Sequence, residues 1–339
     1  MKSRDRILHF IDGKPVDQLP CIPITMMFAA DQIGARYGEY VSDYRVLAAA
    51  QIATAEKFSI DYVSAISDPG REAADCGARI NYFDDQPPAI DEAHALLSNK
   101  EHLVALQVPD PATGRRMSDR LAAVGALKLQ VGDELLVEGW IEGPCAEAAD
   151  LRGINNLMLD FYDDPSFIRD LLEFVVEMEL KFARAQVDAG ADLMGIGDAA
   201  SSLVGPRLYE EFIWDFQNRL VHGVRQMGIP VRLHICGNTR PILGGMGRLG
   251  CEIVDLDYPS PMIEGREAMG PDQVLLGNIN PVETVLNGSP ELIQSQLEQC
   301  WKEAGPRYIV GAGCEIPRGT PSENLLAMTD FARQHNVKG

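Results

Sequence analysis

The stretch Val231-Arg-Leu-His-Ile-Cys-Gly-Asn-Thr-Arg240 places an imidazole and a thiol two residues apart at the end of an apolar run. In an extended strand alternate side chains point the same way, so His234 and Cys236 share one face. Gly237 and Asn238 then end the run. The stretch is therefore predicted to be a buried strand whose carboxyl end carries two potential metal ligands.

Runs of this kind recur along the chain and alternate with helical patterns. From Gly190 onward the alternation is nearly even, and three similar runs precede it. Eight runs that are each followed by helical material predict an α/β fold, a single (β/α)8 TIM barrel with its helices outside. The predicted strands are residues 19–25, 61–67, 135–141, 193–197, 231–235, 253–256, 274–277 and 308–310.

The helices are predicted from apolar spacing and from end signals. Asp164 followed by Pro165 is a typical helix start, with the aspartate as N-cap. The prolines in residues 19–25 remove ladder hydrogen bonds, so this strand is expected to begin late or to lie at a seam. The predicted helices are residues 4–12, 43–58, 118–131, 146–162, 165–189, 206–227, 241–249, 263–269 and 290–304.

Nothing within this series resembles a linker, so residues 1–339 are predicted to form one domain. Residues 69–111 are different, because they are polar and too long for a simple loop. This excursion is expected to carry a hairpin around residues 78–83 and a helix near residues 99–105.

The composition limits the classes of partner. Fifty acidic residues against 30 basic ones give a formal net charge of −20, which argues against nucleic acid or an anionic membrane as a partner. No run approaches the roughly 18 apolar residues of a membrane span, and no export signal follows Met1. The chain is therefore expected to be cytoplasmic. Its seven cysteines are an odd number and widely spaced, so reduced thiols are expected rather than a disulfide framework.

A closed barrel of this kind carries its working residues at the carboxyl ends of the strands. Polar or metal-binding side chains end six of the eight predicted strands. They are Asp68, Asp198, His234 with Cys236, Asp257, Asn278 with Asn280, and Cys314 with Glu315. This pattern predicts a functional site at that end of the barrel, with Asn278 and Asn280 as candidate cofactor-binding residues.

Cys314 is the candidate third metal ligand. The strands that carry His234 and Cys314 can face each other across the mouth of a closed barrel, so their separation in sequence is no objection. Imidazole and thiolate ligands suit zinc, and three protein ligands leave a fourth position open, as in catalytic zinc sites. The alternative is a hydrogen-bonded histidine with two buried thiols.

Three carboxylates are candidate catalytic residues, and each has a structural alternative. Asp198 is either the cap of the following helix or a pocket carboxylate. Asp68 and Glu72 are either residues of a turn and a first helical turn, or polar groups that face the metal.

At the level of motifs the sequence resembles the uroporphyrinogen decarboxylase superfamily, and within it the zinc-dependent corrinoid methyltransferases. The segments that carry the resemblance span nearly the whole chain. They are Val16-Asp-Gln-Leu-Pro20, Gly190-Ala-Asp192, Asp198-Ala-Ala-Ser201, Gly205-Pro-Arg-Leu-Tyr-Glu-Glu-Phe212, His234-Ile-Cys-Gly237, Gly277-Asn-Ile-Asn-Pro281, Gly311-Ala-Gly-Cys-Glu-Ile-Pro317 and Thr320-Pro-Ser-Glu-Asn324.

The resemblance implies a single eight-stranded barrel and separates two chemistries. Decarboxylases of this type carry an arginine-rich segment after the first strand, whereas residues 24–33 contain no arginine here. The methyltransferase branch carries a His-x-Cys pair and a distant cysteine as zinc ligands, which this chain has at His234, Cys236 and Cys314. Its acidic segment after the second strand is matched only at Glu72.

The resemblance therefore implies methyl transfer between a cobalamin and a zinc-activated thiol or a methylated small molecule. The chain has no Asp-x-His-x-x-Gly segment to hold cobalamin itself, so a separate corrinoid protein is expected as partner. The alternatives are a metal-free decarboxylase of the same family and a non-catalytic corrinoid-binding protein.

Overall fold

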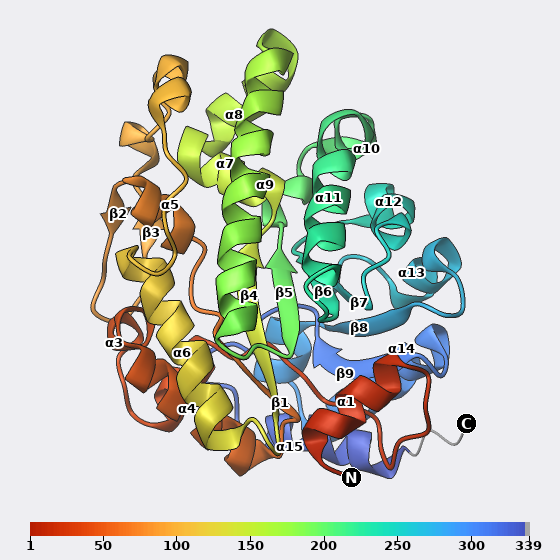
Figure 1. Ribbon diagram of the computed structural model, residues 1–339. Helices are drawn as coiled ribbons and strands as arrows, with labels where there is room; N and C mark the ends of the chain where they lie inside the picture. Colours follow the sequence, from red (N-terminus) through yellow and green to blue (C-terminus); the bar gives the residue numbers. More distant parts are fainter. Residues whose placement is uncertain (336–339) are drawn as a thin grey trace.

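The computed structural model describes residues 1–335 (Figure 1). The last four residues of the predicted domain, 336–339, lie outside the described part. A curved parallel sheet occupies the centre, and helices surround it (Figure 1). This arrangement confirms the predicted α/β class and its barrel-like sheet.

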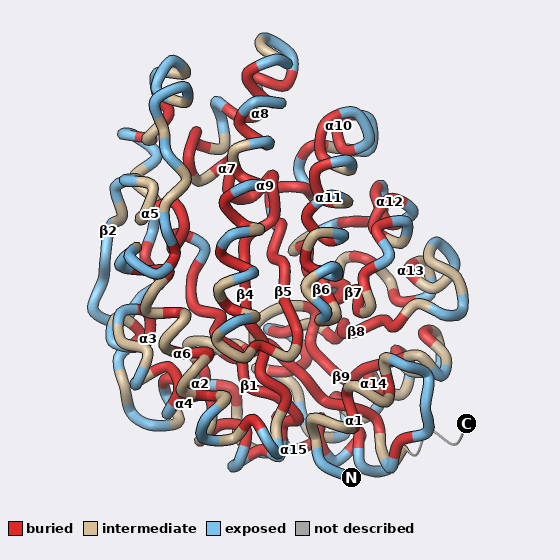
Figure 2. The backbone as a smooth tube through the Cα atoms, viewed as in Figure 1, coloured by how far each residue is buried: buried red, intermediate tan, exposed pale blue. Residues whose placement is uncertain are grey.

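Seven strands form the sheet, and they are buried along their whole length (Figure 2). Burial on both faces explains why they occur in the sequence as nearly continuous apolar runs. In order across the sheet they are β1 (Tyr62–Ser64), β4 (Leu136–Glu142), β5 (Leu193–Gly197), β6 (Val231–Ile235), β7 (Ile253–Leu256), β8 (Val274–Ile279) and β9 (Tyr308–Ala312).

Residues 19–25, the predicted first strand, join the two edges of this sheet. They form one parallel bridge, between Cys21 and Val310 of β9, where Ile22 N donates to Val310 O at 3.0 Å. On the other side Asp61 N, just before β1, donates to Cys21 O at 3.1 Å. The two prolines of the segment have no N–H to donate. The segment therefore closes the barrel without forming a regular strand.

Helices cover the outside of the sheet, and none within residues 1–335 has an apolar stretch long enough to cross a membrane. The longer helices are α1 (Ser3–Ile11), α4 (Tyr44–Phe58), α6 (Arg115–Val131), α9 (Pro165–Asp188), α11 (Trp214–Arg225), α13 (Met262–Met269), α14 (Pro290–Ala304) and α15 (Ser322–Gln334). Shorter ones are α2 (Met27–Gln32), α3 (Tyr37–Ser42), α5 (Arg71–Cys76), α10 (Gly205–Leu208) and α12 (Leu243–Arg248).

Two predicted helices are interrupted. The helix predicted at residues 146–162 divides at Gly153, whose φ of 82° is left-handed, into α7 (Pro144–Arg152) and α8 (Ile154–Asp163). The helix predicted at residues 206–227 contains the π-helical turn η4 (Tyr209–Ile213) before α11. The predicted start of α9 is confirmed, because the carboxylate of Asp164 accepts from Phe167 N at 3.2 Å.

The excursion at residues 69–111 contains the expected elements in modified form. Its hairpin pairs β2 (Ile80–Asn81) with β3 (Ala89–Ile90), and its helical segment is the 3₁₀ helix η2 (Lys100–Ala105). It also contains α5, which begins the excursion and presents Arg71 and Glu72 to the interior.

The interior of the barrel is partly ionic. Arg232 of β6 is fully buried, and its Nη2 donates to Asp255 of β7 at 2.5 Å while its Nη1 lies 3.2 Å from Glu138 of β4. Two carboxylates thus hold one guanidinium. Removal of one member of such a buried group leaves an unpaired charge, so the set fixes how these strands face one another.

Candidate functional site

Three side chains with metal-binding atoms meet at the carboxyl end of the sheet. His234 lies in β6, Cys236 follows that strand, and Cys314 follows β9. His234 Nε2 lies 3.1 Å from Cys236 Sγ, and the two sulfur atoms lie 3.7 Å apart. One ligand atom from each residue lies within 4.8 Å of the others, so the three could share one ion. The structure thus brings together the ligand set predicted from the sequence.

Asp255 of β7 supports the imidazole from behind. Its Oδ2 lies 3.3 Å from His234 Nδ1, although the two are not aligned as a full hydrogen bond. Arg232 holds the same oxygen, and all three residues are buried. A carboxylate at Nδ1 favours the tautomer with its proton there, which leaves the lone pair of Nε2 free toward the thiols.

The two thiols are electrostatically unequal. The pKa of Cys314 is lowered because the Cys236 thiol donates a hydrogen bond to it, and His234 adds to this effect. The pKa of Cys236 is raised by the same hydrogen bond and by burial. One thiolate beside an imidazole is a donor set that fits a borderline-soft divalent cation.

A cavity of about 220 Å³ opens beside these ligands. Its walls are largely apolar, with four carboxylates and one guanidinium set into them. The lining residues are Ile24, Met26, Tyr37, Ile66, Ser67, Asp68, Pro69, Arg71, Pro87, Trp140, Glu142, Gly197, Asp198, Ala199, His234, Cys236, Cys314 and Glu315. A concave apolar site with a few polar groups next to a metal-binding set is the usual form of a small-molecule site.

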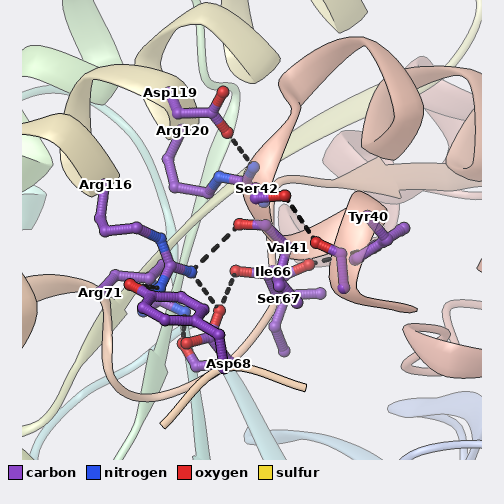
Figure 3. Close-up of polar contacts among 12 residues, drawn as sticks. Tyr40, Val41, Ser42, Ile66, Ser67, Asp68, Arg71, Arg116, Asp119 and Arg120 are labelled. Atoms are coloured by element: carbon purple, nitrogen blue, oxygen red, sulfur yellow. Dashed lines mark hydrogen bonds and ion pairs between the residues drawn. The ribbon is translucent and has the colours of Figure 1, made fainter. Parts of the chain in front are cut away.

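Asp68 is held at this cavity by two arginines from different helices (Figure 3). Arg116 of α6 donates through Nη2 to Asp68 Oδ2 at 2.6 Å, and Arg71 of α5 donates to the Asp68 backbone oxygen. Ser67 Oγ also donates to Oδ2, at 2.9 Å. Within residues 1–335, Oδ1 of Asp68 has no hydrogen-bond partner. It is a buried acceptor without a donor in the described part of the chain.

Asp198 is a cavity carboxylate, as one of the two interpretations predicted, and it caps a different helix from the one considered for it. It does not cap the turn that follows it, and instead its Oδ1 accepts from Ala146 N at 2.7 Å, in the first turn of α7. Gln217 of α11 donates to its Oδ2 at 2.6 Å. Burial raises the pKa of Asp198 to about 6. The residue also lines the cavity, so it is a helix cap for a neighbouring unit and a cavity carboxylate together.

The other predicted site residues lie outside the cavity lining. Glu72 is fully buried behind Arg71, whose Nη2 donates to it at 3.1 Å. Asn278 donates to Ser260 O at 2.6 Å, and Asn280 accepts from the backbone at the start of the π-helical turn η6 (Pro281–Leu286). Roles of these three residues in catalysis or cofactor binding stay predictions.

Comparison with known proteins shows the family. The sequence profile described as Uroporphyrinogen decarboxylase (URO-D) matches residues 2–335. The chain belongs to the uroporphyrinogen decarboxylase family. This result confirms the resemblance that its motifs indicate.

Relatives in the uroporphyrinogen decarboxylase family include proteins of both chemistries. The methylcobamide:CoM methyltransferase MtbA of Methanosarcina mazei is 28% identical, and the alignment covers 98% of each chain. The methylcobamide:CoM methyltransferase MtaA of Methanosarcina barkeri (strain Fusaro) is 26% identical over 96% of each chain. The chloroplastic uroporphyrinogen decarboxylase 2 of Arabidopsis thaliana is 28% identical, but over 62% of this chain and 55% of that protein.

Solved structures support the same fold. A structure described as a methyltransferase from Methanosarcina mazei superposes with a TM-score of 0.90 at 24% identity, covering 98% of this chain and 99% of that one. At this identity the superposition carries the fold alone. The two chains thus share their fold over almost their whole length.

Sequence reasoning missed several residues that line or support the site in this uroporphyrinogen decarboxylase family member. Trp140 and Glu142 lie two residues apart at the end of β4, and both face the cavity. The sequence offered one signal for this part of the site, because Glu142 is a charged residue at the end of an apolar strand. Asp255 could have been found in the same way, as an acid within the apolar run of β7. Arg71 had no comparable signal, because α5 was not predicted.

Proposed function

We propose that the protein is a zinc-dependent methyltransferase that moves a methyl group between a cobalamin and a thiol or a methylated small molecule. The observation that carries the proposal is the meeting of His234, Cys236 and Cys314 at the wall of a cavity. The relatives named methylcobamide:CoM methyltransferase, aligned over almost the whole chain, support the same chemistry. In this proposal the cobalamin is carried by a separate corrinoid protein.

The residues present fit zinc. An imidazole with its partner carboxylate and two thiols is a ligand set that zinc prefers, and the cavity beside them leaves room for a further ligand from the substrate. Zinc bound there would lower the pKa of a substrate thiol, so that the thiolate is available at neutral pH.

The chain itself would orient the metal ligands, exclude water and manage a proton. Asp255 orients His234, and the apolar walls keep the cavity dry. Burial raises the pKa of Asp198 to about 6. Asp198 is therefore largely ionised at neutral pH and can take the proton that a thiol releases in the cavity.

The decarboxylase alternative has less support from the cavity. A substrate with many carboxylates needs several guanidinium groups, and Arg71 is the one arginine among the lining residues. Arg71 is already held by Glu72 and Glu142, at 3.1 and 3.0 Å. A polyanion would therefore meet more carboxylates than cations.

Metal analysis and a methyl-transfer assay test the proposal together. We expect about one zinc per chain in the purified protein, and demethylation of free methylcobalamin with at least one thiol acceptor. Cys314→Ser should lose both, whereas Cys251→Ser, which alters a buried thiol outside the cavity, should keep both. Turnover of uroporphyrinogen by a metal-free protein would contradict the proposal.

A further inference from the structure

The balance of charge around the cavity bears on which substrate it accepts. Four carboxylates line it, those of Asp68, Glu142, Asp198 and Glu315, against the single guanidinium of Arg71. Among residues 1–335, neither Asp198 nor Glu315 forms an ion pair with a basic side chain. The cavity therefore has carboxylates in excess over cations.

The cations in reach are already engaged. Arg71 lies between Glu142 and Glu72, and although its Nε–H has no partner, two carboxylates offset its charge. Arg116 is paired with Asp68 at 2.6 Å. At the rim, Arg318 is shared by Asp31 at 2.7 Å and Asp85 at 2.9 Å. The Nε–H groups of Arg71 and Arg116 have no hydrogen-bond partner among the described residues, but an anionic group entering the cavity would compete with the carboxylates that already pair with these cations.

A metal ion at the predicted site would not offset the excess of carboxylates over basic side chains. A divalent ion held by the thiolates of Cys236 and Cys314 and a neutral imidazole carries no net charge. A substrate thiolate that joins it makes the centre negative. The end of the substrate away from the metal therefore lies among carboxylates and apolar walls. No net positive charge there attracts an anion.

The acceptors and rings at the cavity suit a small cation. Asp68 Oδ1 is a buried acceptor without a partner among the described residues, and Glu315 uses Oε1 for Met27 N at 2.8 Å. Trp140 adds an aromatic ring to the cavity wall. Buried carboxylates beside an aromatic ring form a site that accepts N–H donors and disfavours further oxyanions.

We infer that the small-molecule substrate of this cavity carries a positively charged amine rather than a sulfonate, carboxylate or phosphate. The inference rests on the proposed methyl transfer and names the class of molecule that takes part in it. It differs from what the CoM in the names of the relatives would suggest, since coenzyme M is an anionic sulfonate.

Three ethanethiols that differ only at the far end test the inference on the metal-loaded protein. They are cysteamine with an ammonium group, 2-mercaptoethanol with a hydroxyl, and 2-mercaptoethanesulfonate. Calorimetric titration gives their affinities and methylcobalamin demethylation gives their kcat/KM. The thiolate fraction of each is measured separately, so that the comparison reports charge and not thiol acidity.

We expect cysteamine to bind tightest and the sulfonate weakest, with at least about a tenfold difference between these two. A sulfonate that matches or exceeds the hydroxyl compound would overturn the inference, and so would a hydroxyl compound that matches cysteamine. Zinc content and turnover with any one thiol decide the proposed function separately, so the two can fail independently.

A variant with an added cation provides the reverse test. Met26 lines the cavity and is half-buried, so Met26→Lys can place an ammonium group at its wall, and Met26→Gln is the neutral control. The lysine variant should shift the ratio of sulfonate to cysteamine affinity toward the sulfonate by about tenfold, and the glutamine variant should not. An unchanged ratio in a folded, zinc-loaded lysine variant would count against the charge argument.

Discussion

Some side chains near the carboxyl ends of the strands each contact two different partners in this molecule. Asp198 is both a helix cap and a cavity carboxylate, and Asp255 lies against both an imidazole and a guanidinium. Trp140 is accommodated because β5 has glycines opposite it. At the residue scale, the geometry of the site therefore depends on a few closely packed neighbours. Their packing leaves little space for added atoms.

Gly195→Ala tests this lack of tolerance. A Cβ at Gly195 would lie 2.2 Å from Cε3 of the Trp140 ring, so the ring must move. We expect a loss of about 1–3 kcal/mol in the free energy of unfolding, measured with denaturant. Gly125→Ala is the matched control, because it lies within α6 with nothing near its Cβ and should be neutral or stabilising. Equal effects of the two changes would contradict the packing argument.

Asp255→Asn tests the support of the predicted metal ligand. The amide keeps the shape of the carboxylate but loses the charge that faces His234 Nδ1. We expect zinc affinity to fall by about 10–100-fold, measured by competition with a chelator. Asp160→Asn also removes a buried carboxylate, paired with Arg152 and Lys100 outside the cavity, and should leave zinc affinity unchanged.

At the scale of elements, the seam of the barrel differs from the rest of the sheet. Between β1 and β9 the regular ladder is replaced by residues 19–25, whose contact with β9 is a single bridge. The central strands β5 and β6, in contrast, are paired over four successive residues. Local opening is easiest where few buried hydrogen bonds must break.

Amide hydrogen exchange should reveal this seam. We expect the amides of Ile22 and Asp61 to exchange faster than those of Leu233 and Ile235 in β6, because fewer neighbouring hydrogen bonds hold them. The rates are measured by NMR or by mass spectrometry of short peptides at one pH. Protection at the seam equal to that of β6 would show that the bridge closes the barrel as firmly as a regular strand.

At the scale of the whole molecule, the acidic composition extends into the interior. Burial raises the pKa of Asp150 to about 7 and that of Asp198 to about 6, whereas an aspartate in an unfolded chain titrates near about 3.9. Between these values the folded protein holds protons that the unfolded chain has released. The free energy of unfolding therefore falls as the pH rises from about 4 to about 7.

Denaturant unfolding of the zinc-free Cys314→Ser variant at pH 5 and pH 8 tests this dependence without the loss of zinc affinity that low pH causes. We expect lower stability at pH 8, by an amount on the order of a few kcal/mol, since each unit of pKa shift corresponds to about 1.4 kcal/mol. Asp150→Asn should make the dependence shallower, because it removes one raised carboxyl group that has no hydrogen-bond partner at Oδ2 among the described residues. Equal stability at both pH values would contradict the prediction.

The sequence by itself determined the strand series, the class of fold and the candidate metal-binding set. Burial on both faces makes each parallel strand a short apolar run, and the spacing of two in a strand puts His234 and Cys236 on one face. Both are properties of neighbouring residues, so they can be seen without the fold. Cys314 was predicted as the third ligand because it ends the eighth apolar run, and the ends of two strands can face each other across the mouth of a closed barrel.

Only the tertiary structure decided which groups face each other across the barrel. Asp198 caps α7 rather than its own turn, Asp68 is held by Arg116 of α6, and residues 19–25 close the sheet with one bridge. These contacts join elements that are tens of residues apart, and their geometry depends on how the whole sheet curves and closes. Local spacing carries no information about that curvature, so the charge balance of the cavity became visible only with the chain folded.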